Sequence, residues 1–178
     1  MTRQVALLRG INVGGHNRLA MAQLRELMES LGYGDVRTHL QSGNVVFTGD
    51  AAPDQAAAGI AAAIAERLGL RLRVVVRTRD ELAAAVDGNP LAAAATDPAR
   101  LIVLFLSAAP DPQLLRGIDP AAYEPERLAI CGREIHVWCA NGVYASPLLQ
   151  VLSERRLGVT VTARNWRTVT RLLALASE

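Results

Sequence analysis

The sequence contains no lysine, only two cysteines and few aromatic residues. All 19 basic residues are arginines, and against 17 acidic residues they leave a net charge of +2, too small to indicate nucleic-acid binding by itself. Cys131 and Cys139 form no C-x-x-C pair, so we expect two packed thiols in a reducing compartment rather than a disulfide or a metal site.

Long apolar segments are also missing. No stretch approaches the ~20 apolar residues of a membrane span, and the chain enters a strand without the basic and apolar segments of a signal peptide. We therefore expect a cytoplasmic protein with no membrane partner. A chain of 178 residues buries roughly 70% of its extended surface, enough for one domain or two packed halves.

The first half of the chain alternates between strand and helix patterns. We predict a strand at 3–9, a helix carrying Leu24, Leu27, Met28 and Leu31 before Gly32, strands at 36–40 and 45–48 around the turn 41–44, a helix from Pro53 to Gly69, and a strand at 72–77. This βαββαβ order is ferredoxin-like and predicts the strand order 4-1-3-2.

The second half repeats the order of elements, without a residue-by-residue match. Thr78 to Glu81 predicts a capping box, and the helix ends at Gly88-Asn89-Pro90, where we place the boundary between halves 1–88 and 89–178. The later elements are a strand at 101–106, a short helix at 110–116, strands at 127–130 and 134–139, a helical segment from Pro147 to Leu157, a strand at 159–162, and an extra C-terminal helix at 165–177 with Trp166, Val169, Leu172 and Leu173 on one face. The predicted fold is therefore α/β of the α+β kind, with two ferredoxin-like halves.

The main candidate site is the glycine-rich stretch 9–17, which follows the first strand. In a ferredoxin-like half this loop lies at the same end of the sheet as the hairpin 41–44. Glycine amides, a helix N-terminus and an arginine together favour an anion such as phosphate. The predicted ligand-binding residues are Arg9, Asn12, Gly14, Gly15, Gln41, Ser42 and Asn44. In the alternative interpretation, the glycines only make tight turns and Asn12 caps backbone groups.

Several common catalytic patterns are absent. The glycine loop is neither a Walker A motif nor a G-x-G-x-x-G motif. Ser42 beside His39 or His16 suggests a nucleophile and a base, but no third residue is placed to orient the base. The three histidines are far apart in sequence, so we expect no metal, and nothing indicates a cofactor.

A second candidate patch consists of Arg164, Asn165, Trp166 and Thr168. Asn165 is suited to cap the last helix while Trp166 anchors it, because tryptophan is usually buried. The functional alternative is a stacking platform flanked by arginine, as in single-stranded nucleic-acid binders. The acidic pairs Asp80-Glu81 and Glu124/Glu126 are explained by helix capping and by a solvated loop, respectively.

The sequence resembles a known family in four motifs: 7–15, 41–47, Asn89-Pro90-Leu91 and 164–168. It is similar to the bacterial family catalogued as domain of unknown function 1697. The resemblance implies two related ferredoxin-like subdomains but no reaction. Its motifs carry over to Arg9, Gly10, Asn12, Gly14, Gly15, Gln41, Ser42, Gly43 and Asn44, and to Arg164, Asn165, Trp166 and Thr168. His16 replaces the basic residue that follows Gly-Gly in the family, so a lysine–phosphate contact is not expected.

Three classes of function remain open. The first is a binding module for a phosphate-bearing small molecule or nucleic acid, whose bases a ferredoxin-like sheet can accept on a flat face. The second is a hydrolase or transferase that uses the same pocket, and the third is a protein-interaction module. Salt separates the first from the third, because phosphate contacts weaken steeply with ionic strength.

Overall fold

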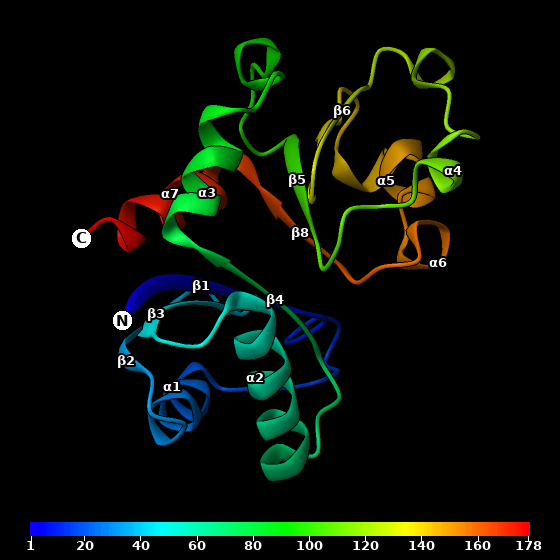
Figure 1. Ribbon diagram of the computed structural model, residues 1–178. Helices are drawn as coiled ribbons and strands as arrows, with labels where there is room; N and C mark the ends of the chain where they lie inside the picture. Colours follow the sequence, from blue (N-terminus) through cyan, green and yellow to red (C-terminus); the bar gives the residue numbers. More distant parts are fainter. The chain divides into compact units, whose positions relative to one another are not determined.

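The computed structural model describes all residues 1–178, and the chain divides into two compact units (Figure 1). One consists of Met1–Ala83 with Arg171–Glu178, and the other of Ala84–Thr170. Each contains a four-stranded antiparallel sheet, so the predicted α+β class with two βαββαβ-like halves is confirmed. Whether the chain divides at residues 88 and 89 into folding halves stays a prediction.

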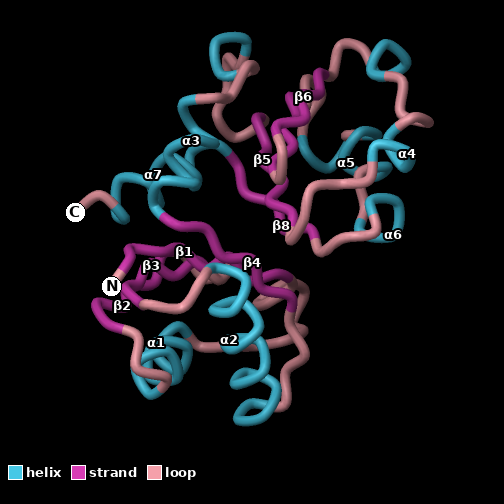
Figure 2. The backbone as a smooth tube through the Cα atoms, in the orientation of Figure 1, coloured by secondary structure: helices cyan, strands magenta, loops and turns pink.

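The first unit has the predicted order of elements (Figure 2). They are β1 (Thr2–Arg9), α1 (Met21–Ser30), β2 (Gly34–His39), β3 (Asn44–Gly49), α2 (Pro53–Leu68) and β4 (Arg73–Thr78). The sheet order β2-β3-β1-β4 is the predicted 4-1-3-2 read from the opposite edge. Helix α2 begins with Pro53 and ends where Gly69 takes a left-handed φ of 67°, the two positions where these residues terminate helices most readily.

The central strands of the first sheet are buried on both faces. Helices α1 and α2 cover one face, where Phe47 packs edge-on against Tyr33 with ring centroids 4.7 Å apart. On the opposite face Val5, Leu7, Val46 and Val75 are at most 2% exposed. A central strand buried on both sides is apolar throughout rather than alternating, which explains the uninterrupted run in β1.

The second unit and the helices that enter it follow the same plan. The elements are α3 (Arg79–Asp87), η1 (Ala92–Ala94), β5 (Leu101–Leu106), α4 (Pro112–Leu115), η2 (Pro120–Tyr123), β6 (Arg127–Cys131), β7 (Glu134–Trp138), η3 (Val143–Ala145), α5 (Pro147–Val151), α6 (Glu154–Leu157), β8 (Val161–Asn165) and α7 (Trp166–Ala176). The sheet order is β6-β7-β5-β8. Here too the central strands are buried on both faces, since Val103, Phe105 and His136 are at most 1% exposed on the face away from α5.

Two helix caps confirm predictions. Thr78 Oγ1 accepts from the amide of Glu81 at 3.1 Å, and Glu81 Oε2 accepts from the amide of Thr78 at 2.8 Å, which is the reciprocal capping box. Asn165 Oδ1 accepts from the amide of Thr168 at 2.9 Å and caps α7. In both units a strand therefore passes directly into a capped helix.

Three predictions about the second unit were wrong in detail. The segment from Pro147 to Leu157 forms two short helices, because Ser153 accepts from the amide of Arg156 at 3.3 Å and starts a new one. The last strand is Val161–Asn165 rather than 159–162. Glu126 does not lie in a solvated loop: it is 3% exposed. Its Oε2 accepts from Ser146 Oγ and from the amide of Leu148, both at 3.1 Å, so it anchors the start of α5.

None of the helices is both long and apolar enough to cross a membrane. Both cysteines are free thiols, with Cys139 buried and Cys131 half-buried. Burial raises the pKa of the Cys139 thiol, which favours its protonated form.

Candidate functional site

The glycine loop of the first unit is a tight reversal of the chain. The amide of His16 donates to the carbonyl of Val13 at 3.1 Å. Gly14 and Gly15, between them, have φ of 58° and 80°. Positive φ at both central residues defines a type I′ turn, which glycine adopts without strain. The loop therefore needs its glycine pair in order to turn.

Asn12 joins this loop to the hairpin, as the predicted topology requires. Its Nδ2 donates to the carbonyl of Gln41 at 2.7 Å and to that of Leu19 at 2.9 Å. Its Oδ1 accepts from the amide of Leu19 at 2.9 Å. These three hydrogen bonds favour the alternative interpretation for Asn12, in which it caps backbone groups and shapes the loop.

The hairpin residues divide into buried and exposed groups. Asn44 is fully buried, and its Nδ2 donates to the carbonyl of His39 at 2.8 Å and to Ser42 Oγ at 3.1 Å. Gly43 packs closely against the side chains of Leu8 and Ile11. Gln41 and Ser42 are exposed. Burial, reinforced by the charge of Arg171, lowers the pKa of His39.

A pocket of about 460 Å³ opens between the loop and the hairpin. Its lining residues are Asn12, Gly15, Arg18, Leu19, Ala20 and Gln41. Helix α1 begins at its wall, where the N-cap residue Ala20 offers no side-chain acceptor and the first turn has no acidic residue. The positive end of this helix is therefore not neutralised by its own side chains.

Arginines gather at this end of the first sheet. The strand register places Asn44 opposite Leu7 and Arg73 opposite Arg9, so segments 9–20, 39–44 and 69–73 meet there. These segments contain four arginines and no aspartate or glutamate. All four are exposed, and they are Arg9, Arg18, Arg71 and Arg73.

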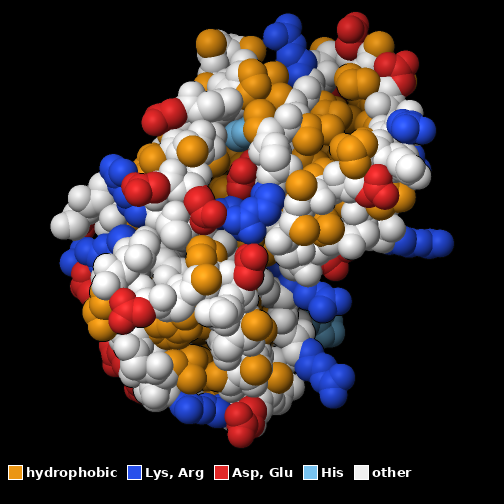
Figure 3. All heavy atoms as spheres, viewed as in Figure 1, with side chains coloured by type: hydrophobic (Ala, Val, Ile, Leu, Met, Phe, Trp, Pro, Cys, Tyr) orange, Lys and Arg blue, Asp and Glu red, His pale blue; other side chains and the backbone are white.

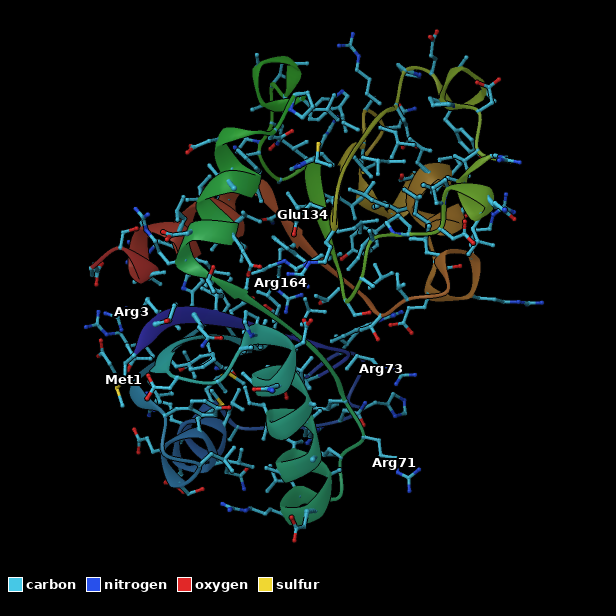
Figure 4. The ribbon with its side chains drawn as sticks, viewed as in Figure 1. Met1, Arg3, Arg71, Arg73, Glu134 and Arg164 are labelled. Carbon is cyan, nitrogen blue, oxygen red and sulfur yellow. The ribbon has the colours of Figure 1, made fainter.

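The figures show the same concentration of charge. Arg71 and Arg73 project from the edge of the first unit in Figure 4, and blue side chains gather along that edge in Figure 3. Sequence reasoning missed Arg18, Arg71 and Arg73. The predicted 4-1-3-2 strand order could have identified Arg71 and Arg73, because it places the start of the fourth strand beside the end of the first.

The second predicted patch lies in the other unit, where most of its side chains are buried or bonded within the fold. Arg164 is 8% exposed, and its Nη1 donates to Thr162 Oγ1 at 2.9 Å and to the carbonyl of Ala163 at 2.7 Å. Burial lowers the pKa of its guanidinium to about 10. Thr168 is buried and Trp166 is half-buried. Glu134 and Arg164 lie on the same face of the second sheet (Figure 4), which the register confirms.

The central strands of both sheets are buried on both faces, so neither sheet offers a fully open face for stacking bases, although Ala163 on the edge strand β8 is exposed. The residues do not assemble a metal site either: no group of three or more histidine, cysteine, aspartate or glutamate side chains is close enough to hold an ion.

Comparisons with known proteins agree with this description. A solved structure, the conserved bacterial protein SP0830 from Streptococcus pneumoniae, matches with a TM-score of 0.73 and 25% identity over 98% of each chain. No curated protein matches. The family model described as DUF1697, a protein of unknown function, matches residues 1–136, which include the glycine loop and the hairpin and end before Arg164. The chain therefore belongs to the DUF1697 family.

Proposed function

We propose that the first unit binds a phosphate-bearing ligand, a nucleotide or a nucleic acid, in the pocket between the glycine loop and the hairpin. The observation that carries this proposal is the end of the first sheet, where three segments contribute four exposed arginines and contain no acidic residue of their own. In a chain whose net charge is only +2, such segregation creates a local positive field that attracts polyanions.

The pocket adds the short-range groups that phosphate needs. Arg18 lines it and supplies a planar fork of N–H donors that matches two phosphate oxygens. Helix α1 starts at its wall without a side-chain cap, so its first amides complement the same negative charge. Asn12 holds the two sides of the pocket together through Leu19 and Gln41.

Arg9 and Arg73 lie beyond the pocket along the strand ends and extend the positive surface. A mononucleotide reaches Arg18 and the helix, whereas a longer chain of phosphates also reaches these two arginines. Both ligands share the same phosphate chemistry, and the number of arginines involved in binding distinguishes them.

The test is a thermal-shift screen at low salt with nucleotides, sugar phosphates, short RNA and short DNA. A ligand at ~100 times its Kd adds about 2.7 kcal/mol to the free energy of unfolding, which raises the Tm by several degrees. We expect a hit that Arg18→Ala abolishes and that Arg155→Ala leaves intact. Arg155 is a matched control because it is an exposed arginine of the second unit.

The affinity of each hit is then measured at several salt concentrations on the wild type, Arg9→Ala and Arg73→Ala. For single-stranded nucleic acid, log K falls with log salt by about 0.7 per phosphate contact, so each variant lowers the slope. For a mononucleotide, the slope of log K against log salt is small, and Arg9→Ala and Arg73→Ala leave it unchanged. The proposal fails if no probe shifts the Tm, or if Arg155→Ala weakens a hit as much as Arg18→Ala does.

A further inference from the structure

A second pocket, of about 360 Å³, lies in the second unit beside the edge strand β8. Its lining residues are Ala99, Ile102, Val143, Tyr144, Leu149, Ala163, Arg164 and Asn165. It includes two of the four residues of the second predicted patch, but none of the groups invoked above for phosphate binding.

The pocket exists because the crossover helix of this unit is interrupted. Helix α2 of the first unit has 16 residues, whereas α5 and α6 have five and four. The strand registers make Ala163 the counterpart of Val76, since Leu104 and Ala6 are their partners. Val76 is 1% exposed, but Ala163 is exposed. The shorter helices thus leave open a part of the sheet that is covered in the first unit.

The lining combines apolar walls with one aromatic ring. Ile102, Val143 and Leu149 provide aliphatic surface. Tyr144 is 102% exposed, although the turn that carries it is ordered by a 3.3 Å hydrogen bond from the amide of Ser146 to the carbonyl of Val143. The backbone of this turn places the ring at the rim of the apolar pocket, where it is uncovered and offers its face to a planar ligand.

One polar group of the lining is oriented in advance. Asn165 Oδ1 accepts from the amide of Thr168 at 2.9 Å, which fixes the side-chain amide. The group that Asn165 offers a ligand is therefore Nδ2, which donates hydrogen bonds and cannot accept them. A ligand of this pocket needs a planar aromatic body with an acceptor on its edge.

We propose that this pocket binds a nucleobase, which stacks on Tyr144 and accepts a hydrogen bond from Asn165 Nδ2. Every base has a π-face for stacking and carries nitrogen or oxygen acceptors on its edge. The apolar walls remove the flat surface of the base from water. This inference is independent of the phosphate site, because it requires neither Arg18 nor the glycine loop.

The test uses phosphate-free probes, namely adenosine, guanosine, cytidine and uridine, added to the full chain in 0.5 M salt. Nuclear magnetic resonance follows the side-chain amide of Asn165 and the ring of Tyr144 during each titration. We expect at least one nucleoside to shift both signals with the same Kd. Tyr144→Ala weakens binding at least fivefold, the lower limit of the stacking contribution, and Tyr144→Phe retains it.

Three further variants separate binding from folding. Ala163→Leu fills the pocket floor and abolishes binding, while Ala58→Leu, at an exposed position of α2, leaves it intact. Asn165→Asp keeps the acceptor that caps α7 but removes both N–H donors, so it weakens binding without lowering the Tm. The inference is overturned if none of the four nucleosides shifts the two signals, or if Tyr144→Ala and Ala163→Leu bind as the wild type does.

Discussion

Arg77 and Arg164 are structural counterparts that make the same contact in the two sheets. Nη1 of Arg77 donates to the carbonyl of Val76 at 3.0 Å, and Nη1 of Arg164 donates to that of Ala163 at 2.7 Å. Each is buried and lies opposite a valine of the central strand, Val5 or Val103. Arg77 is followed by Thr78, which caps α3, and Arg164 is followed by Asn165, which caps α7. The repeat therefore extends from the order of elements to individual residues.

Replacing Arg164 by lysine should destabilise the fold. Lysine has no planar fork, so Arg164→Lys loses the simultaneous contacts to Thr162 Oγ1 and the carbonyl of Ala163 and leaves a charge buried. We expect the free energy of unfolding to fall by about 1–3 kcal/mol in urea denaturation. Arg167→Lys, at an exposed position three residues later, should change it by less than about 0.5 kcal/mol. Equal effects of the two substitutions would contradict the structural role of Arg164.

Gly43 and Gly132 form a matched pair in the turns of the two hairpins. Both have positive φ, 86° and 61°, but a Cβ on Gly43 would lie 2.7 Å from Ile11 Cδ1 and 2.8 Å from Leu8 Cβ, whereas nothing lies within 4 Å of one on Gly132. Gly132→Ala should cost about 1 kcal/mol from backbone strain alone. Gly43→Ala adds a steric clash and should cost about 2–4 kcal/mol. Thermal unfolding of both variants measures the difference.

Glu126 is expected to contribute strongly to stability although it belongs to an acidic, proline-containing segment. Glu126→Ala leaves the buried Ser146 hydroxyl and the amide of Leu148 without their acceptor, and should cost about 2–4 kcal/mol. Glu124→Ala, at an exposed position two residues earlier, should change stability by less than about 0.5 kcal/mol. Hydrogen exchange provides a second readout, because the Leu148 amide loses protection only in Glu126→Ala.

Stability should fall with acidification because of His136. This side chain is fully buried, neither ring nitrogen has a hydrogen-bond partner, and burial lowers its pKa from 6.5 to about 4. Between these two values the unfolded chain binds the proton and the folded chain does not, so stability is lost as the pH falls from 6.5 towards 4. The loss attributable to His136 is on the order of 2–3 kcal/mol.

His136→Leu is the matched variant for this prediction, since the counterpart of His136 in the first sheet is the aliphatic Val46. Urea denaturation at pH 7, 5.5 and 4.5 compares the two proteins. We expect the wild type to lose more stability than His136→Leu on acidification. Parallel pH profiles would show that His136 titrates normally.

Local sequence patterns predicted most of the fold, because proline, glycine and capping residues mark where helices and strands begin and end. Pro53 and Gly69 delimit α2, and the capping box Thr78/Glu81 starts α3, as predicted. The helix 147–157 was predicted as one because its apolar residues keep the helical period. The interruption comes from Ser153, whose Oγ accepts from the amide of Arg156 and caps a second helix, because such a local side-chain hydrogen bond competes with a continuous helix.

The candidate site was harder to predict, because its residues come from segments that meet only through the topology. Arg73 lies 64 residues after Arg9 and faces it across β1 and β4. The residue types of the glycine loop indicated a binding loop or a tight turn. The role of Asn12, however, depended on which backbone carbonyls its side chain contacts in the folded protein. Glu126 gave no signal at all, because a carboxylate in a polar segment normally remains in water.

The burial of the central strands on both faces has a consequence for the chain before it folds. Leu101–Leu106 is six consecutive apolar residues without charge, proline or glycine, the composition of a segment that associates with copies of itself. In the native sheet β5 is protected between β7 and β8. In the newly made chain, Arg100 immediately before the segment is the nearest charge that opposes intermolecular pairing, so its replacement should lower the yield of refolded protein more than it lowers native stability.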